Sequence, residues 1–206
     1  MNTDYCINDM LNSHQITLSE IGFQEIYEKL ITNIDNDWNG FIQEANKGDV
    51  LHQALLAKRC LDLDNENLAI TYMMMVHNHG DCYFDYDIAV FYLNGRGGLS
   101  KDEKKAFDLF LKLAKLEDLL SMREVGKCYE DGIGTPIDMN QAIYWYKRAN
   151  KKGDEWAGLV IGVRYAQGYH GLKKNNKTAK KWFKQAKKSS IQEVVDIASE
   201  WLQNLM

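Results

Sequence analysis

The sequence predicts an all-α fold: a right-handed superhelical solenoid of helix-turn-helix repeats with a helical cap at each end. Only one of its 206 residues, Pro136, is a proline, which is too few for a fold rich in β-turns. Alanines recur every 36 or 37 residues, each followed by large apolar residues at helical spacing. Glycine-rich segments separate the helical patterns, as the turns of helical hairpins would.

The second helix of each repeat is marked by an alanine. The four alanines, spaced 37, 36 and 37 residues apart, are Ala69, Ala106, Ala142 and Ala179. In the third repeat, Trp145, Tyr146 and Ala149 follow the alanine at three, four and seven residues. Residues at these spacings share one face of a helix, so each alanine belongs to an amphipathic helix.

The first helix of each repeat is expected to begin at an aspartate. The four aspartates are Asp49, Asp81, Asp118 and Asp154. Aspartate is a good N-cap because its carboxylate accepts hydrogen bonds from the free N–H groups of the first turn. Eight residues after the aspartates stand the small residues Ala57, Ala89, Gly126 and Gly162. Small side chains at these positions would let a neighbouring helix approach closely.

A glycine-rich segment follows the first helix in the last three repeats, as in GIGTP at residues 132–136. Its first glycine is three residues after a tyrosine, at Gly95, Gly132 and Gly168. A helix often ends with glycine in the left-handed conformation. A phosphate-binding loop would instead follow a β-strand and occur once. Because these glycines follow a helix and recur with the repeat, we interpret them as hinges of helical hairpins.

Four repeats are expected over residues 49–190: a degenerate unit at 49–80, then 81–117, 118–153 and 154–190. The first is degenerate because only 9 residues separate Cys60 from Ala69, so its glycine turn is missing. Residues 16–48 are expected to form N-terminal capping helices and residues 191–206 a C-terminal capping helix. The capping boxes Thr17–Glu20 and Ser190–Glu193 are expected to start two of these helices. Residues 1–15 show no periodicity and are expected to be loose.

The repeat pattern resembles the Sel-one-like repeat, a relative of the tetratricopeptide repeat. It consists of a small residue, a tyrosine, a glycine-rich turn and Ala-x-x-Trp-Tyr-x-x-Ala, and the unit 118–153 matches it best. The resemblance covers residues 49–190 and implies a stack of hairpins whose first helices line a concave groove. It also implies a role as an adaptor in bacterial signalling, envelope regulation or host contact. Since the matching residues are packing residues, they indicate fold more strongly than function.

The chain is expected not to be an enzyme and to use no cofactor and no metal. His77 and His79 lie two residues apart on a helix and diverge, and no acid or thiol completes a ligand set. The four cysteines show no CxxC and no paired short spacing. Cys60 and Cys128 lie on or beside the apolar face of a first helix, so we expect buried, inert thiols.

A protein-binding groove is expected on the first helices, at positions two, five, six and nine after the aspartate. The residues predicted to bind a partner there are Tyr83, Tyr86, Asp87, Val90, Arg123, Lys127, Trp156, Leu159 and Val163. The aromatic and apolar side chains among them are not needed by the repeat's own core, and exposed aromatic residues are typical of binding hot spots. In the alternative interpretation the terminal helices cover them, above all Trp156 and Val163.

The charge of the chain is unevenly distributed. Residues 1–100 carry a net charge of −10 and residues 101–206 a net charge of +6. Eight lysines and no acid lie between Lys173 and Lys188. These lysines form a solvated face, a site for an acidic protein or, least favoured, a nucleic-acid site.

The predicted function is that of a non-enzymatic bacterial adaptor or regulator that binds a protein partner in its groove. The alternative is a cytoplasmic immunity protein that neutralises a toxin by covering it, because such an inhibitor needs only one good surface. No apolar run approaches the roughly 20 residues of a membrane span, and no signal peptide is visible, so a cytoplasmic location is expected. We also expect a monomer when the partner is absent.

Overall fold

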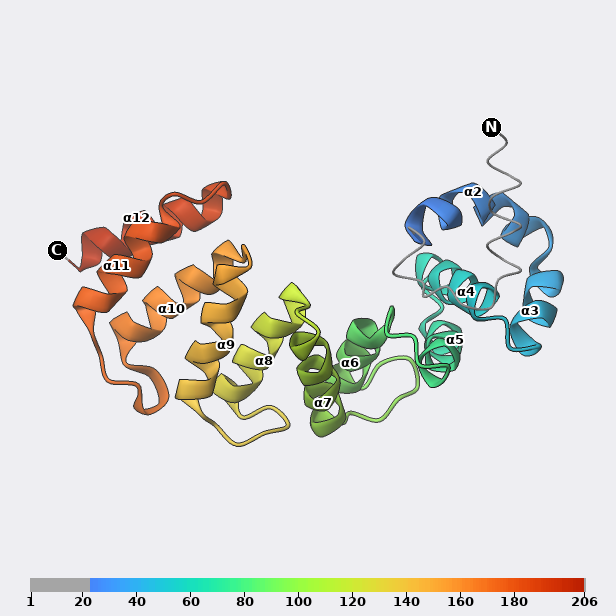
Figure 1. Ribbon diagram of the computed structural model, residues 1–206, viewed down its shortest axis with the longest axis horizontal. Helices are drawn as coiled ribbons and strands as arrows, with labels where there is room; N and C mark the ends of the chain where they lie inside the picture. The colour runs from blue at the N-terminus through green and yellow to red at the C-terminus, as the bar shows by residue number, and fades with distance from the viewer. Residues whose placement is uncertain (1–22, 206) are drawn as a thin grey trace. The chain divides into compact units, whose positions relative to one another are not determined.

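The computed structural model describes residues 23–205, in which the chain forms eleven α-helices, one short 3-10 helix and no β-strand (Figure 1). This confirms the predicted all-α class. The elements in chain order are α2 (Phe23–Asn36), α3 (Trp38–Asn46), α4 (Val50–Asp62), α5 (Glu66–Asn78), α6 (Asp85–Asn94), α7 (Glu103–Lys115), α8 (Leu119–Asp131), α9 (Met139–Lys151), α10 (Glu155–Gln167), η2 (Tyr169–Gly171), α11 (Asn176–Ala186) and α12 (Gln192–Asn204). The loose segment predicted for residues 1–15 and the capping box Thr17–Glu20 lie outside the described residues.

The chain divides into two compact units, Met1–Asp102 and Glu103–Met206. The division falls inside the predicted repeat 81–117, between α6 and α7. Each unit has its own core, and each is described by itself below.

The first unit is built around the hairpin of α4 and α5. Helix α3 packs on α4, α2 packs on both α3 and α4, and α6 packs on α5. The core between these helices contains fully buried side chains such as Leu55, Met73 and Ile88. The missing glycine turn of this hairpin is replaced by a short connection in which Asp64 adopts the left-handed conformation, with φ of 55°.

In the second unit each helix packs on the next. Helices α8 and α9 form one hairpin and α10 and α11 another, while α7 packs on α8, α9 on α10, and α12 on both α10 and α11. Phe110 and Phe183, from the second helices of two repeats, are completely buried. The stripe of large apolar residues predicted for the second helices therefore forms the core.

The small residues of the first helices stand where a second helix comes closest. A Cβ atom at Gly126 would lie 2.6 Å from the ring of Tyr146, and one at Gly162 would lie 2.7 Å from the ring of Phe183. Real Cβ atoms do not approach other atoms this closely. Glycine at these positions lets an aromatic ring of the second helix lie directly on the backbone of the first.

The glycine segments are hinges, as predicted. Gly132 ends α8 in the left-handed conformation with φ of 74°, and its N–H group donates to the carbonyl oxygen of Cys128. Gly134, also left-handed, lies so close to α7 that a Cβ atom would be 2.1 Å from the carbonyl oxygen of Glu103. The segment therefore turns the chain and packs against the preceding second helix.

Three of the four predicted aspartate caps are confirmed, and one is wrong. The carboxylates of Asp49, Asp118 and Asp154 each accept a hydrogen bond from the first turn of their helix, at 2.7–2.9 Å. Asp81 instead accepts from the N–H group of Tyr83 at 2.8 Å, within a turn that precedes α6. Helix α6 begins only at Asp85 and has no side-chain cap.

The predicted capping box Ser190–Glu193 is also wrong. The carboxylate of Glu155, on the preceding hairpin, accepts hydrogen bonds from the hydroxyls of Ser189 and Ser190 and from the N–H group of Ser190. The hydrogen bond from Ser189 is the main reason that the pKa of Glu155 is lowered. Helix α12 therefore starts at Gln192 without a side-chain cap, because its serines bind the neighbouring repeat.

We predict that Gly126→Ala destabilises the protein. The new methyl group would overlap the ring of Tyr146, and overpacking of this kind costs about 1–3 kcal/mol. Glycine to alanine in an unhindered helix gains up to about 1 kcal/mol, so a loss in urea unfolding identifies the close approach. Lys127→Ala, at the exposed next position, is the control and should leave the free energy of unfolding nearly unchanged. A stabilised Gly126→Ala protein would contradict the proposed packing.

Candidate protein-binding site

The nine predicted binding residues divide between the two units. Tyr83, Tyr86, Asp87 and Val90 belong to the first unit and the other five to the second. Each group is assessed within its own unit, by exposure and by the contacts of its side chains.

The four residues of the first unit lie at and just before the start of α6. Tyr83 is 37% exposed and precedes the helix, while Tyr86, Asp87 and Val90 are half-buried on it. The core face of α6 consists of other residues, including Ile88, Ala89 and Phe91. We call Tyr83, Tyr86, Asp87 and Val90 the α6 patch.

Asp87 is the charged residue of the α6 patch. Burial raises the pKa of its carboxyl group, and the positive charge of Lys58 on α4 only partly opposes this. Lys58 itself is ion-paired with Asp62, with Nζ and Oδ1 2.6 Å apart. Within residues 23–205 the half-buried Asp87 carboxylate makes no hydrogen bond and no ion pair, but it is not among the buried polar atoms cut off from solvent.

The tyrosine beside it shares this environment. Burial, and then the charge of Asp87, raise the pKa of the Tyr83 hydroxyl, and the ring of Tyr83 packs edge-on against Phe84. An exposed aromatic ring beside a carboxylate suits a lysine or arginine side chain, which would gain an ion pair and a cation–π contact together.

In the second unit, Arg123 serves the stack of repeats. Its guanidinium group donates to the carboxylate of Asp154 at 3.0 Å, and Asp154 is 96% buried because it also caps α10. Arg123 therefore ties α8 to the start of the next repeat. Lys127, one turn further along α8, is exposed and makes no ion pair in the described part of the chain.

The prediction that Leu159 is exposed is wrong. Leu159 is only 4% exposed and lies in a core cluster with Phe183 of α11 and Val194 of α12. Trp156 and Val163 are half-buried and pack against the same cluster. Helix α12 takes the place that the first helix of a further repeat would occupy, so the alternative in which a terminal helix covers this face is the correct one here.

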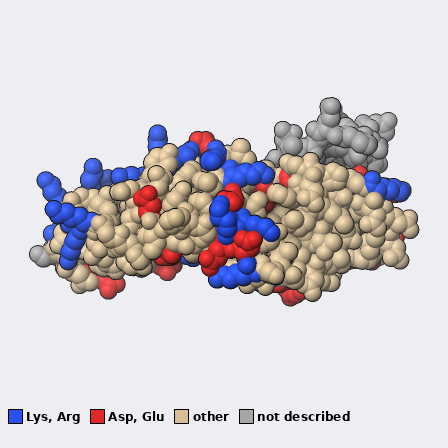
Figure 2. Space-filling view, turned by 90° about the horizontal axis from the view of Figure 1, so that it is seen from below, with Lys and Arg blue, Asp and Glu red and all other residues tan. Residues whose placement is uncertain are grey.

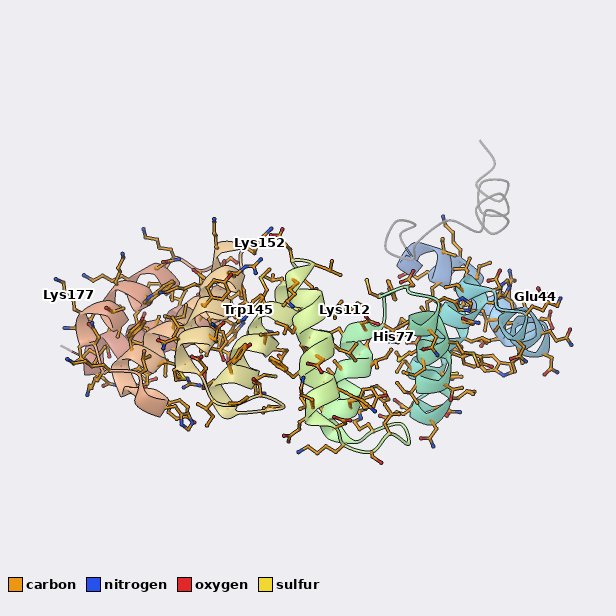
Figure 3. The ribbon with its side chains drawn as sticks, turned by 60° about the horizontal axis from the view of Figure 1, so that its bottom comes forward. Glu44, His77, Lys112, Trp145, Lys152 and Lys177 are labelled. Carbon is orange, nitrogen blue, oxygen red and sulfur yellow. The ribbon has the colours of Figure 1, made fainter. Side chains whose placement is uncertain are left out.

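The exposed apolar side chains that the sequence analysis missed include Tyr144 and Leu116. Tyr144 is 50% exposed on α9, with the guanidinium carbon of Arg148 5.9 Å from its ring centroid, and Leu116 is 64% exposed at the end of α7. Tyr144 lies off the apolar stripe of α9, and Leu116 directly follows the last residue of α7, so position relative to the stripe and the helix end is the signal that could have identified them. Figure 3 labels Trp145, the neighbour of Tyr144 that does belong to the stripe.

The described residues hold no cluster of side chains suited to a metal ion. No three His, Cys, Asp or Glu side chains of residues 23–205 come together as metal ligands. His77 contacts the buried Asp85, with Nδ1 and Oδ1 2.5 Å apart. Burial raises the pKa of the Cys60 thiol to about 11 and that of Cys128 to about 12, so neither is a nucleophile at neutral pH.

A helix that crosses a membrane needs about 20 predominantly apolar residues. No helix among residues 23–205 combines the length and the apolar character that a membrane-spanning segment needs.

Comparison with known proteins identifies the repeat. The family model described as Sel1 repeat matches residues 78–118, 119–154 and 160–190, which together are just over half of the chain. The degenerate unit 49–80 lies almost entirely outside these matches.

Similar proteins come from distant organisms. An F-box protein of Arabidopsis thaliana is 35% identical over 96 residues, which are 46% of this chain and 25% of the relative. Chitin synthase regulatory factor 3 of Schizosaccharomyces pombe is 32% identical over 108 residues, 52% of this chain and 12% of the relative. The chain thus spans a quarter or less of the length of these two relatives.

A solved structure shares the fold. The protective antigen c5321 of uropathogenic Escherichia coli, which displays an SLR fold, superposes with a TM-score of 0.63 at 20% sequence identity. The match covers 76% of this chain and 34% of the antigen.

We predict that Arg123→Met lowers the free energy of unfolding by about 1–2 kcal/mol, because the buried carboxylate of Asp154 would lose its ion pair. Lys127→Met on the same helix is the matched control, since it removes a charge without an ion pair. Urea unfolding of both variants measures the difference. Equal stability of the two variants would show that the Arg123–Asp154 contact does not hold the repeats together.

We predict that Asp87→Asn stabilises the protein at neutral pH. A carboxyl whose folded pKa is raised favours the folded state only while protonated, so its ionised form destabilises the fold above that pKa. The advantage of the variant should shrink as the pH falls and vanish below 3.8, the ordinary aspartate value. Glu124→Gln, at the same position of α8, is the control. Urea midpoints that are independent of pH for Asp87→Asn would contradict the desolvation of Asp87.

Proposed function

We propose, because the chain belongs to the Sel1 repeat family, that it is a non-enzymatic protein-binding module that acts as an adaptor or regulator. Proteins built from Sel1 repeats generally mediate protein–protein interactions. The matched repeats supply packed helices, and exposed side chains on these helices select the partner.

The observation that carries the proposal is the half-buried carboxylate of Asp87, which has no ion pair among the described residues, beside the exposed ring of Tyr83. Partial burial of a charge without an ion pair lowers stability, and only the charge of Lys58 opposes this cost. Such a group is typical of a surface that becomes complete when a partner binds, since binding sites trade stability for affinity. The chemistry of the α6 patch favours a partner that inserts a basic side chain next to apolar residues.

The contacts of the remaining predicted residues support a narrower site than the sequence suggested. Arg123 is engaged with Asp154, and Leu159 is in the core, so neither supplies a free contact for a partner. Among the predicted residues of the second unit, Lys127 remains exposed, with the 45% exposed Leu120 on the same helix. We place the main binding energy in the α6 patch, because an exposed aromatic ring there lies beside a carboxylate without an ion pair in the described residues.

The proposed regulatory role draws on one relative. The Schizosaccharomyces pombe protein that shares this repeat is named a chitin synthase regulatory factor. In such a role, the module would bind another protein and change its activity or its location without performing chemistry itself.

The test is quantitative capture of partners by the full chain from its native cells. We predict that a partner enriched by the wild-type protein is lost with the double variant Tyr83→Ala, Asp87→Lys, because an aromatic anchor and a charge together contribute about 2 kcal/mol or more, roughly a 30-fold change in affinity. The control is Tyr144→Ala, which removes an exposed tyrosine from the outer face of α9. Isothermal titration with the purified partner gives the affinities.

The outcomes separate the possible roles. A partner retained by the double variant but lost with Tyr144→Ala would overturn the α6 patch as the site. A captured toxin that the chain inactivates would make it an immunity protein, the alternative considered from the sequence. A captured protein whose activity or location is altered would establish the adaptor or regulator.

A further inference from the structure

The most highly charged surface of the second unit lies on and around α11. It consists of eight lysines, which we call the lysine face: Lys173, Lys174, Lys177, Lys180, Lys181, Lys184, Lys187 and Lys188. All are exposed except the half-buried Lys180. Figure 2 shows blue side chains gathered at the α11 end of the chain, and Figure 3 shows Lys177 projecting outward there.

No acidic side chain neutralises the lysine face. Residues 156–192 contain no aspartate and no glutamate, and none of the eight lysines forms an ion pair with a described residue. The acid that precedes this stretch, Glu155, is occupied by Ser189 and Ser190. The other second helices differ, because Lys104 of α7 pairs with Asp108 and Lys152, just after α9, pairs with Glu117.

Several of these lysines oppose the formation of α11, whereas Lys184 in its last turn and Lys187 at its C-cap lie where the helix dipole favours a cation. Lys177 and Lys181, like Lys180 and Lys184, are four residues apart on the helix, and like charges at this spacing repel. Lys173 and Lys174 precede the helix and Lys177 lies in its first turn, where the positive end of the helix dipole disfavours a cation. A face that only contacts water would be equally soluble with glutamate at some of these positions. The uniform positive charge therefore indicates a face that binds a ligand.

The ligand has to be anionic, and the structure favours a polypeptide over a nucleic acid. Bidentate recognition of phosphate uses the forked guanidinium group of arginine, and the lysine face has no arginine. The three arginines of the second unit are already engaged: Arg123 with Asp154, Arg148 over Trp145, and Arg164 with Glu130.

The face offers little aromatic platform on which unpaired bases could stack, because the one ring of α11 that reaches solvent is that of the half-buried Trp182. Phe183 of α11 is completely buried and stacks on Trp201 of α12, with ring centroids 5.7 Å apart. Ala179 and Ala186 of this stripe are buried as well, which leaves the half-buried Trp182 as the one apolar side chain of α11 that a lipid surface could contact.

We infer that the lysine face is a second interaction surface, one that binds an acidic helical segment of a protein partner. The inference rests on the proposed protein-binding function but uses residues outside the α6 patch. Lys177, Lys180, Lys181 and Lys184 recur at the spacing of one helix face over about 11 Å, the length of two turns. A helix that carries carboxylates at the same three- and four-residue spacings presents its charges with the same rise of about 1.5 Å per residue.

The experiment uses the full chain and two labelled peptides of about 20 residues with identical composition. One places glutamates at i, i+3, i+4 and i+7 so that they share a helix face, and the other distributes them around the helix. We predict that the one-face peptide binds about tenfold more tightly in fluorescence anisotropy at about 0.1 M salt. The triple variant Lys177→Gln, Lys181→Gln, Lys184→Gln should lose about tenfold of that affinity.

A matched control removes the same charge elsewhere on the second unit. Lys115→Gln, Lys147→Gln, Lys151→Gln changes exposed lysines of α7 and α9 and should keep the wild-type affinity within about twofold. The variant Tyr83→Ala, Asp87→Lys should bind the peptide as the wild type does. If the wild-type chain does not bind the one-face peptide but still captures a partner through the α6 patch, this inference is rejected and the proposed function stands.

Other outcomes also overturn the inference. Equal affinity of the wild type for the two peptides would show that the face attracts acidic peptides only through its unspecific charge. An equal loss of affinity in the two triple variants would show the same. Tighter binding at the same salt of a single-stranded oligonucleotide of about 20 nucleotides would identify a nucleic acid as the ligand. Tighter binding of phosphatidylserine vesicles would identify a membrane surface. Salt-sensitive self-association that the α11 variant abolishes would identify a second copy of this chain.

Discussion

The close contact between an aromatic ring and the backbone of a neighbouring helix is the constraint on which the second unit depends. Tyr146 lies on Gly126 and Phe183 lies on Gly162, each at a distance that no Cβ atom could tolerate. The contact sets the separation of the two helices within a hairpin, and with it the position of every side chain that reaches the next hairpin. Because the same geometry recurs after one repeat, consecutive hairpins present matching surfaces, and the unit grows by addition of equivalent layers.

Polar contacts between successive repeats then fix the stacking. The ion pair of Arg123 with Asp154 joins residues 31 apart in sequence, and Glu130 of α8 is paired with Arg164 of α10 at 2.6 Å. Glu130 also accepts a hydrogen bond from the hydroxyl of Tyr146, so one buried carboxylate connects three helices. A charged side chain on a first helix can therefore belong to the stack, and its exposure in a helical wheel does not establish that it faces a partner.

The periodic features could be predicted from the sequence and the contacts between repeats could not. The alanine and glycine spacings follow from packing inside one hairpin, so they predicted the fold and the hinge at Gly132 correctly. The capping role of Asp81 failed because aspartate also stabilises turns, and here its carboxylate binds the N–H group of Tyr83 before the helix starts. Ser190 and Leu159 failed for a different reason: both are engaged by a neighbouring helix, and a pattern within one segment does not reveal which neighbour covers it.

Function in such a scaffold has to be sought where side chains act against stability. The repeat residues are all explained by packing, so they cannot discriminate one partner from another. Asp87 and the lysine face are different, because the first is a half-buried carboxylate without an ion pair in the described residues and the second a row of like charges along a helix. Neither improves the fold, and each would gain free energy from a ligand of opposite charge. Their opposite signs mean that one partner could engage both only with a basic and an acidic segment, so a single uniformly charged ligand is excluded as the occupant of both surfaces.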